Sequence, residues 1–502
     1  MNKLLSAVML LILNVTAHFL PFERAALAPD DYASLVRLQG SQFSLMDYAD
    51  RPLNFLFLHL QSLVIGDSAF WGFMLLLASS SFLLISVFLL LNELLGDGIS
   101  AFLASAIFCL LPNTLEIYHT AIFANINFAL SVYLLCLFFY LRYLDSGRAG
   151  LLFASTALYA VGVFWYEAGF FTPLIMLVAV LLRKKDKALS WIVFLPVSAV
   201  YIAFRLTGAF GIAARVQESH AASLGVIPFN LIELAHHYVG RYMARSVLYG
   251  LFKLPSIEMP WILIAGLLGM LFALVIVGAV RRYEPKKVPA KVLVLACAIS
   301  IFWLAPILLN ERGGIGGRHL VLPSLGIAIL ALWLFGFIRR GRGLVTGVFF
   351  LILLAISLGN GWSQVIACRI NAAIYNYLKD SRPALQRASY VVIDVKSFAQ
   401  NIPFTFVDRD FNVLNTYYGA QALEEWGLRS MVRLAAGDKE KAVYIAKSRP
   451  GFSSGKIEFD IPKYQGYRAE TAEQVSLDAG KSFIVDYDSV YAKGFRNGAA
   501  VK

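Results

Sequence analysis

The stretch AFWGFMLLLASSSFLLISVFLLLNE at residues 69–93 is apolar almost throughout and is long enough to cross a bilayer as a helix. The rest of the chain has the same character, because 59% of its residues are hydrophobic, 15% are charged and the mean hydropathy is +0.67. We therefore expect a polytopic α-helical membrane protein with about eleven spans. The expected spans are residues 4–20, 69–93, 99–115, 128–144, 149–166, 168–182, 188–207, 260–280, 290–309, 320–338 and 343–361.

Basic clusters between these spans predict the orientation. Residues 183–187, 281–287 and 339–342 are rich in lysine and arginine and fall in loops that this count places in the cytoplasm. Binding of anionic lipid headgroups is the alternative role, but orientation accounts for them sufficiently. Residues 4–20 are expected to be a retained signal anchor with a cytoplasmic amino terminus. These cytoplasmic loop clusters account for most of the net charge of +12. The sequence lacks a compact module of basic and aromatic residues, so nucleic-acid binding is not expected.

The composition changes after residue 361. Residues 1–361 form the expected membrane domain, and 362–502 have the mixed polarity of a small α/β domain. An odd number of spans places this domain on the side opposite the amino terminus. The four cysteines are scattered and imply no disulfide or metal framework. The expected strands are 390–395, 404–407 and 482–485, and the expected helix is 420–436.

Ionisable residues gather on that same extracytoplasmic side. Asp30 and Asp31 are adjacent in the first loop, where burial and like-charge repulsion can raise the pKa of a carboxyl group. A solvated loop start is the alternative. Because charges near hydrocarbon are costly, their convergence from distant loops predicts a functional site. The other members of this set are Asp47, Asp50, Arg51, Glu116, His119, Glu167, Glu311, Arg312, Arg318 and His319.

The glycine-rich loop 310–319 carries several of these residues, among them Arg318. Glycine lets backbone N–H groups approach a phosphate closely, and a guanidinium can hold two phosphate oxygens at once. The alternative is a flexible loop whose arginines reach lipid headgroups. Residues 53–65, which follow Pro52, are apolar but short, so we expect an interfacial helix there.

The connection 208–258 contains a second basic feature. His237, Arg241 and Arg245 recur every four residues, which places them in one stripe on a helix. The stripe either belongs to an interfacial helix whose cations snorkel to the headgroups, or it grips an anionic lipid-linked substrate.

A series of short motifs resembles those of a known superfamily. The segments PDDY at 29–32, DRPL at 50–53, LPNTLE at 111–116, YEAG at 166–169 and GRHLVLPS at 317–324 follow one another in the expected order. They resemble motifs of the GT-C superfamily of integral-membrane glycosyltransferases. The likeness is strongest to the protein O-mannosyltransferase and tetratricopeptide-linked transmembrane mannosyltransferase branches, with bacterial aminoarabinose transferases and O-antigen glucosyltransferases as relatives.

The chain also departs from these relatives. Asn125 and Asn127 stand where the mannosyltransferases tend to carry Arg and Asp, Tyr166 replaces a Lys, and no tetratricopeptide array follows. The resemblance fits a bacterial envelope enzyme in the inner membrane better than a eukaryotic protein mannosyltransferase, with the carboxy-terminal domain in the periplasm.

The resemblance implies a transfer, with inversion, of a sugar from a polyprenyl-phosphate donor to an extracytoplasmic acceptor: O-antigen, lipid, another envelope glycan or a protein. Asp30 or Asp31 is the candidate general base, and Arg318, His319 and Arg51 are the candidates for the donor phosphate. Glu116, His119 and Glu167 would line the substrate pocket. For Glu116 and Glu167, holding a structural arginine or capping a helix end is an equal alternative.

No cofactor is predicted, although a divalent metal is possible because some relatives use one. The carboxy-terminal domain either selects the acceptor or covers the cavity. Three other functions compete with a transferase: a transporter or flippase for lipid-linked sugars, an O-antigen polymerase or ligase, and an inactive scaffold.

Overall fold

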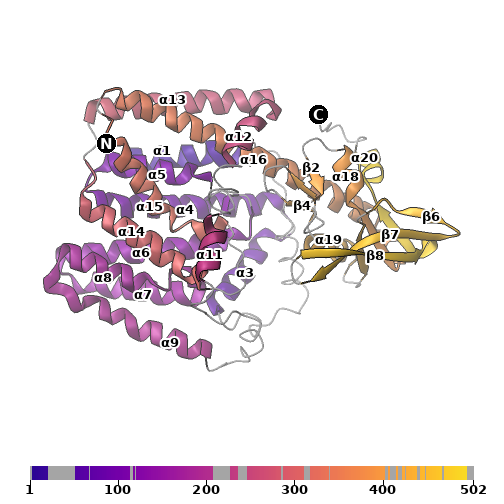
Figure 1. Cartoon of the computed structure of the whole chain (residues 1–502), viewed down its shortest axis with the longest axis horizontal. Helices are drawn as coiled ribbons and strands as arrows, with labels where there is room; N and C mark the ends of the chain where they lie inside the picture. Colours follow the sequence, from indigo (N-terminus) through magenta and orange to yellow (C-terminus); the bar gives the residue numbers. More distant parts are fainter. Residues whose placement is uncertain are drawn as a thin grey trace.

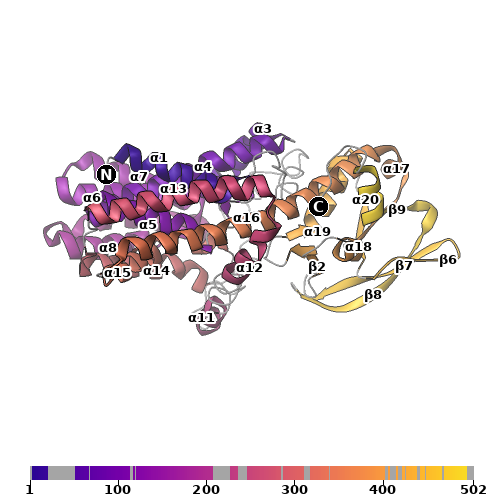
Figure 2. The same cartoon turned by 90° about the horizontal axis from the view of Figure 1, so that it is seen from above.

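The structure of the chain is a computed structural model. It has two parts, a bundle of helices and a smaller α/β part beside one end of the bundle (Figures 1 and 2). The residues that the structure describes are 3–20, 51–66, 68–112, 117–118, 120–206, 227–235, 246–283, 287–309, 317–338, 340–401, 405–407, 414–416, 421–423, 425–437, 441–446, 448–465 and 468–494.

The bundle is built from long apolar helices and short linking ones. Its first half contains α1 (Lys3–Asn14), the π-helical turn η1 (Val15–Phe19), α3 (Pro52–Ile65), α4 (Ala69–Leu95), α5 (Gly98–Leu110), α6 (Phe123–Ser146), α7 (Ala149–Trp165), the 3₁₀ turn η5 (Glu167–Gly169), α8 (Thr172–Arg183), the 3₁₀ segment η6 (Lys185–Phe194) and α9 (Leu195–Leu206). Its second half contains α11 (Ile227–Ala235), α12 (Ser246–Lys253), η10 (Leu254–Ser256), α13 (Met259–Tyr283), α14 (Ala290–Leu308), η11 (Gly317–Leu320), α15 (Ser324–Phe335) and α16 (Arg342–Asp380).

The chain is thus a polytopic α-helical membrane protein with a small carboxy-terminal sheet region. Within the described residues, six helices are long and apolar enough to cross a membrane by length and composition. Each of the eleven expected spans overlaps a helix, but several of these helices are short, so the count of eleven stays a prediction. The six are Phe70–Leu95, Phe123–Ser146, Lys185–Phe204, Met259–Arg282, Ala290–Leu308 and Arg342–Asp380.

Prolines set several helix ends differently from the expected spans. The span expected at 99–115 ends as a helix at Leu110, because Leu111 precedes Pro112 and adopts an extended backbone with φ −65° and ψ 128°. The span expected at 320–338 begins as a helix only at Ser324, after Pro323. In both places a hydropathy window continues through a proline at which the helix stops or starts.

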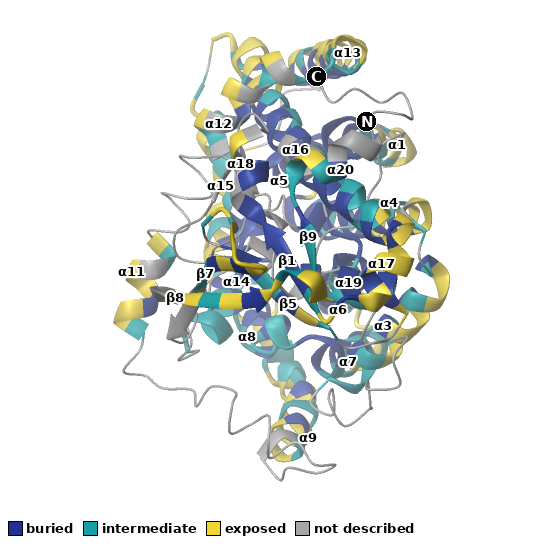
Figure 3. Ribbon diagram, turned by 90° about the vertical axis from the view of Figure 1, so that its right-hand side faces the viewer, coloured by how far each residue is buried: buried dark blue, intermediate teal, exposed yellow. Residues whose placement is uncertain are grey.

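The centre of the bundle is α5. Every residue from Ile99 to Leu110 is buried, and α5 packs against α1, α4, α15 and α16. By contrast, α13 lies on the outside and exposes apolar side chains such as Leu263, Leu267 and Leu274 (Figure 3). A helix that is apolar all round suits the core of a bundle, and an exposed apolar face suits lipid.

Buried amides and hydroxyls connect the helices inside the bundle. The Asn14 side chain in α1 donates to the hydroxyls of Ser80 and Ser81 in α4 at 3.0 and 3.2 Å. Asn127 in α6 donates to the Ser79 hydroxyl at 3.2 Å. In an apolar surrounding, such interhelical hydrogen bonds fix which faces of the helices meet.

The carboxy-terminal part contains three small sheets. A parallel sheet has the order β5-β1-β9, and two antiparallel sheets have the orders β2-β3-β4 and β6-β7-β8. Their elements are β1 (Tyr390–Asp394), β2 (Thr405–Val407), β3 (Leu414–Thr416), β4 (Gln421–Leu423), β5 (Ala442–Ala446), β6 (Gly451–Ser453), β7 (Lys456–Gln465), β8 (Arg468–Asp478) and β9 (Ser482–Val485), with helices α17 (Arg382–Arg387), α18 (Val395–Asn401), α19 (Glu425–Ala436) and α20 (Tyr487–Gly494) and the 3₁₀ turn η12 (Ala479–Lys481).

Strand β1 shows how this part buries its sheet. Val391 and Ile393 point into a core that includes α16 and α19, whereas Val392 belongs to a second core with Ile457 and Phe459 of β7. Because side chains alternate along a strand, one face of the sheet is covered by helices and the other by the β7-β8 hairpin. The structure confirms strands at 390–394, 405–407 and 482–485 and a helix at 425–436, but Val395 begins α18 and residues 421–423 of the expected helix form β4. Residues 404, 420 and 424 lie outside the described residues.

Helix α16 belongs to both parts of the chain. It runs without a break through the expected boundary at 361/362, and Ile370 and Ile374 lie in the same core as β1. Within the bundle it packs closely on α12, since a Cβ added at Gly359 would lie 1.8 Å from the Gly250 carbonyl oxygen. Two glycines therefore allow the backbones to approach each other.

Candidate functional site

Helix α3 places a polar stripe against the bundle. Its buried positions Asn54, Leu58, Gln61 and Ile65 recur at a spacing of three or four residues, and Arg51 continues the same face at the helix start. The opposite face exposes Leu56, Leu60, Leu63 and Val64. The helix begins at Pro52, as expected, because the ring fixes φ and the missing N–H has no partner at a first turn.

Arg51 forms an ion pair with Glu167, 116 residues further along the chain. Glu167 opens η5, directly after α7 ends at Trp165 and Tyr166 takes an extended backbone with φ −156° and ψ 115°. The Arg51 guanidinium also lies over the Tyr166 ring at 5.4 Å from its centre. The side chains remain 29% and 22% exposed, so the pair is accessible from outside the bundle.

A network of buried amide side chains joins the helices that carry this pair. The Asn125 side-chain oxygen accepts the indole N–H of Trp165, and its amide donates to the Asn54 oxygen at 2.5 Å. The ring of Phe57 stacks on Trp165 at 3.8 Å. The start of α3, which directly follows Arg51, is thereby fixed to both α6 and α7. These contacts orient the Arg51 guanidinium.

The YEAG turn is shaped by a close contact with Tyr133. A Cβ at Gly169 would lie 2.4 Å from the Tyr133 ring, and one at Gly162 would lie 2.8 Å from it. The Tyr133 hydroxyl donates to the Tyr166 carbonyl oxygen at 2.7 Å. Glycine at 169 is therefore required for the turn that presents Glu167.

Helix α14 connects this turn to the GRHL segment. Trp303 donates its indole N–H to the Thr172 hydroxyl at 3.0 Å, and that hydroxyl donates to the Gly169 carbonyl at 2.5 Å. The same helix packs against η11, which contains the backbone of Arg318 and the half-buried His319. The YEAG and GRHL segments thus lie against one helix.

His18 is a buried polar residue that the sequence interpretation missed. It lies in the π-helical turn η1, shortly before the first loop, where its Nε2–H donates to the Cys109 carbonyl at 2.8 Å. Its ring stacks on Tyr118 with centres 3.8 Å apart. Such π-helical turns occur frequently at functional sites.

Most of the expected site residues fall outside the described residues. Of the expected set, the structure brings Arg51 and Glu167 together and supports the alternative that Glu167 holds an arginine. Within the described residues, no group of three or more His, Cys, Asp or Glu side chains could hold a metal ion. The residues outside the description are Asp30, Asp31, Glu116, His119, His237, Arg241 and Arg245, together with the side chain of Arg318.

The polar partners Asn54, Gln61 and Trp165 were also missed from the sequence. The Gln61 side chain donates to the Ala121 carbonyl oxygen at 2.6 Å, and Ala121 precedes Asn125 by four residues in the chain. The spacing of Arg51, Asn54 and Gln61 along a mostly apolar helix was the available signal, since it places all three on one face.

No protein-family model matches the chain, and a search of curated proteins gives no match. Among solved structures, the arabinofuranosyltransferase AftD from Mycobacteria is similar, with 14% identity and a TM-score of 0.40 over 88% of this chain and 31% of that one. The oligosaccharyltransferase AglB from Archaeoglobus fulgidus, in complex with an inhibitory peptide and a dolichol-phosphate, has 12% identity and a TM-score of 0.42 over 88% of this chain and 69% of that one.

The names of the two solved proteins are those of a glycosyltransferase and an oligosaccharyltransferase. The chain spans about a third of the length of the arabinofuranosyltransferase. At these TM-scores the likeness assigns no donor, acceptor or residue role to this chain.

Proposed function

We propose that the chain is a membrane-bound hexosyltransferase of the bacterial inner membrane, with residues 1–361 as the transferase domain and 362–502 as a periplasmic domain. It moves a sugar from a polyprenyl-phosphate donor to an extracytoplasmic acceptor, which is O-antigen, a lipid, another envelope glycan or a protein. The observation that carries the proposal is the Arg51–Glu167 ion pair and the buried network beneath it. An apolar bundle keeps such a costly, oriented pair at its end where the pair has a function.

The proposed site extends from this pair into the first loop. The loop that carries Asp30 and Asp31 joins the chain at Arg51, and the amino terminus is cytoplasmic in the proposed orientation. Helix α3, which begins directly after Arg51, lies at the end of the bundle near the α/β part (Figure 1).

The proposed reaction is a direct displacement. Asp30 or Asp31 takes the proton of the acceptor hydroxyl, the hydroxyl oxygen bonds to the anomeric carbon, and the bond from that carbon to the phosphate oxygen breaks. The polyprenyl phosphate leaves with the electron pair, and Arg318, His319 and Arg51 stabilise its charge. Glu167 keeps Arg51 in place. Glu116 and His119 line the sugar pocket, and the stripe of His237, Arg241 and Arg245 holds the lipid-linked substrate.

The test measures sugar transfer by the purified full-length protein from radiolabelled polyprenyl-phosphate sugars to candidate acceptors. Asp30→Asn or Asp31→Asn should lower turnover by about 10²–10⁴-fold, the usual contribution of a general base. Asp186→Asn is the matched control, because Asp186 is exposed in η6. In the same assay Arg318→Ala should weaken donor binding, whereas the exposed Arg340→Ala should not.

Two results would overturn this assignment. Donor turnover that survives both aspartate substitutions would remove the proposed base. Movement of the lipid-linked sugar across the bilayer without formation of a transferred product would favour the transporter instead.

A further inference from the structure

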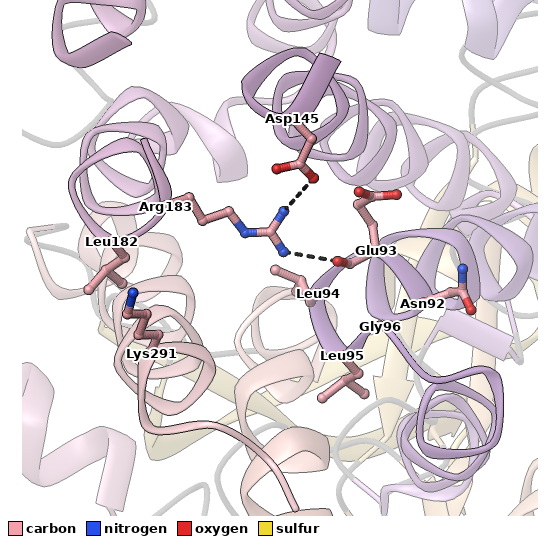
Figure 4. Close-up of a pocket in the computed structure, with 9 residues that line it drawn as sticks. All are labelled: Asn92, Glu93, Leu94, Leu95, Gly96, Asp145, Leu182, Arg183 and Lys291. Carbon is pink, nitrogen blue, oxygen red and sulfur yellow. Dashed lines mark hydrogen bonds and ion pairs between the residues drawn. The ribbon is translucent and has the colours of Figure 1, made fainter. Parts of the chain in front are cut away.

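A charged pocket lies at the other end of the bundle, away from the Arg51–Glu167 pair (Figures 1 and 4). Three helices end and one begins around it: α4 contributes Glu93, α6 contributes Asp145, α8 contributes Arg183 and α14 contributes Lys291. From Asn125 to Asp145, α6 rises about 30 Å at about 1.5 Å per residue. The pocket is therefore separate from the proposed transferase site by most of a membrane thickness.

The pocket volume is about 570 Å³, within the range of about 300–1,000 Å³ that is usual for small-molecule sites. It lies where α4, α6 and α8 end and α14 begins. Its apolar lining comes from Leu94, Leu95 and Leu182, and the other lining side chains, apart from Gly96, are polar or charged. A molecule with a compact polar group and an apolar continuation fits such a lining.

The charged side chains of the pocket differ in how firmly the protein holds them. Arg183 donates to an Asp145 carboxylate oxygen at 3.2 Å and to the Glu93 carbonyl oxygen at 2.9 Å, so its position is fixed (Figure 4). Lys291 is exposed and forms no ion pair with any residue in the described part of the chain. Glu93 lies 3.6 Å from Arg142 and keeps 15% of its side chain exposed.

Two carboxylates and two cations line the pocket, so neither a simple anion nor a simple cation suits it. A phosphate alone would meet Glu93 and Asp145, and an amine alone would meet Arg183 and Lys291. A ligand that carries both groups places the phosphate by the cations and the ammonium by the carboxylates. The pocket therefore matches a zwitterion.

The chemistry of the lining also selects the kind of ammonium. A primary ammonium has three N–H donors for carboxylate oxygens, whereas a quaternary ammonium has none and is bound by aromatic rings. None of the residues that line the pocket is aromatic. A primary amine is thus preferred over choline.

The location of the pocket at the helix ends points to a membrane lipid as the molecule that carries this zwitterion. Val294 is an exposed apolar side chain one turn along α14 from Lys291, and Leu181 is an exposed apolar side chain in the last turn of α8. They offer a path for acyl chains along the outside of the bundle. We propose that this pocket binds the headgroup of a membrane phospholipid with a primary amine, such as phosphatidylethanolamine.

The test titrates full-length protein in detergent with phosphatidylethanolamine, phosphatidylcholine or phosphatidylglycerol of identical acyl chains, and native mass spectrometry measures the bound fraction. Phosphatidylethanolamine should bind about tenfold more tightly than the other two. Lys291→Gln should weaken its binding about tenfold and leave the melting temperature of the lipid-free protein unchanged, because Lys291 is exposed. Lys287→Gln, an exposed lysine on the same segment that does not line the pocket, is the matched control.

Two further arms separate the sources and the roles. Glu93→Gln should bring the affinities for phosphatidylethanolamine and phosphatidylglycerol together, because it removes an acceptor for the ammonium. Soluble O-phosphoethanolamine should bind far more weakly than the lipid. Equal affinities for all three lipids, equal behaviour of the two lysine variants, or a soluble headgroup that binds as tightly as the lipid would each overturn the proposal.

Discussion

The two ends of the helix bundle each hold an arginine–carboxylate pair, but the surroundings of the two pairs differ. Glu167 and Arg51 rest on a buried network of amides and rings from three helices. Arg183 and Asp145 join helix ends, and the Asp145 side chain is 50% exposed. The first pair is therefore oriented by buried partners, whereas in the second pair the arginine is held by a further contact and the carboxylate is half exposed. The first arrangement suits a fixed site, and the second suits a pocket that accepts a ligand.

Among the variants that test this comparison, Asn125→Ala is expected to have the largest effect on the free energy of unfolding. This change leaves the Trp165 indole N–H and the Asn54 side-chain oxygen without their buried partner and should lower the free energy of unfolding by about 2–5 kcal/mol. The matched change at the pocket end is Asn92→Ala, for which we expect at most about 0.5 kcal/mol. Denaturant titration in mixed micelles, followed by tryptophan fluorescence, measures both. Similar values would show that the network gives no special support.

The next effect is expected for Glu167→Gln. The Arg51 charge then loses its carboxylate in a partly buried place, and the free energy of unfolding should fall by about 1–3 kcal/mol. Asp145→Asn should cost at most about 1 kcal/mol, because that pair is more exposed. The double variant Arg51→Gln, Glu167→Gln should recover part of the loss. Additive losses would contradict a direct ion pair.

The smallest effect is expected for Arg183→Ala. It removes both an exposed ion pair and a cation at the carboxyl end of α4, which together are worth about 1 kcal/mol. Raising the salt concentration should shrink this difference, since exposed charges are screened. Arg148→Ala, an exposed arginine at the start of α7, is the control with no expected change. A salt-independent loss would mean that the contact at this end is as well shielded as the one at Arg51.

The fold was predictable where hydropathy and proline chemistry decide it. Long apolar runs predicted where helices occur, and Pro52 marked the start of α3. The helix ends at Leu110 and Ser324 were missed because a hydropathy window averages over Pro112 and Pro323. A proline therefore sets the end of a helix even where the mean hydropathy of the surrounding window stays high.

The candidate site was predictable only in part. Arg51 and Glu167 could both be selected as charges near hydrocarbon, but nothing in the sequence pairs residues so far apart. Asn125 was noted only as a departure from the relatives, although its amide joins α3 to Trp165. The pocket at Lys291 was hidden for another reason, because its residues come from four helix ends that only the packing brings together.

Helix α16 has a mechanical consequence for the whole protein. Its 39 residues contain no proline, and at about 1.5 Å per residue they make a rod of about 58 Å that ends inside the core of the α/β part. A rod anchored in two cores transmits tilt and twist instead of absorbing them. Because a spanning helix responds to the thickness of the hydrocarbon layer partly by tilting, we expect a change in bilayer thickness to be transmitted through α16 to the α/β part.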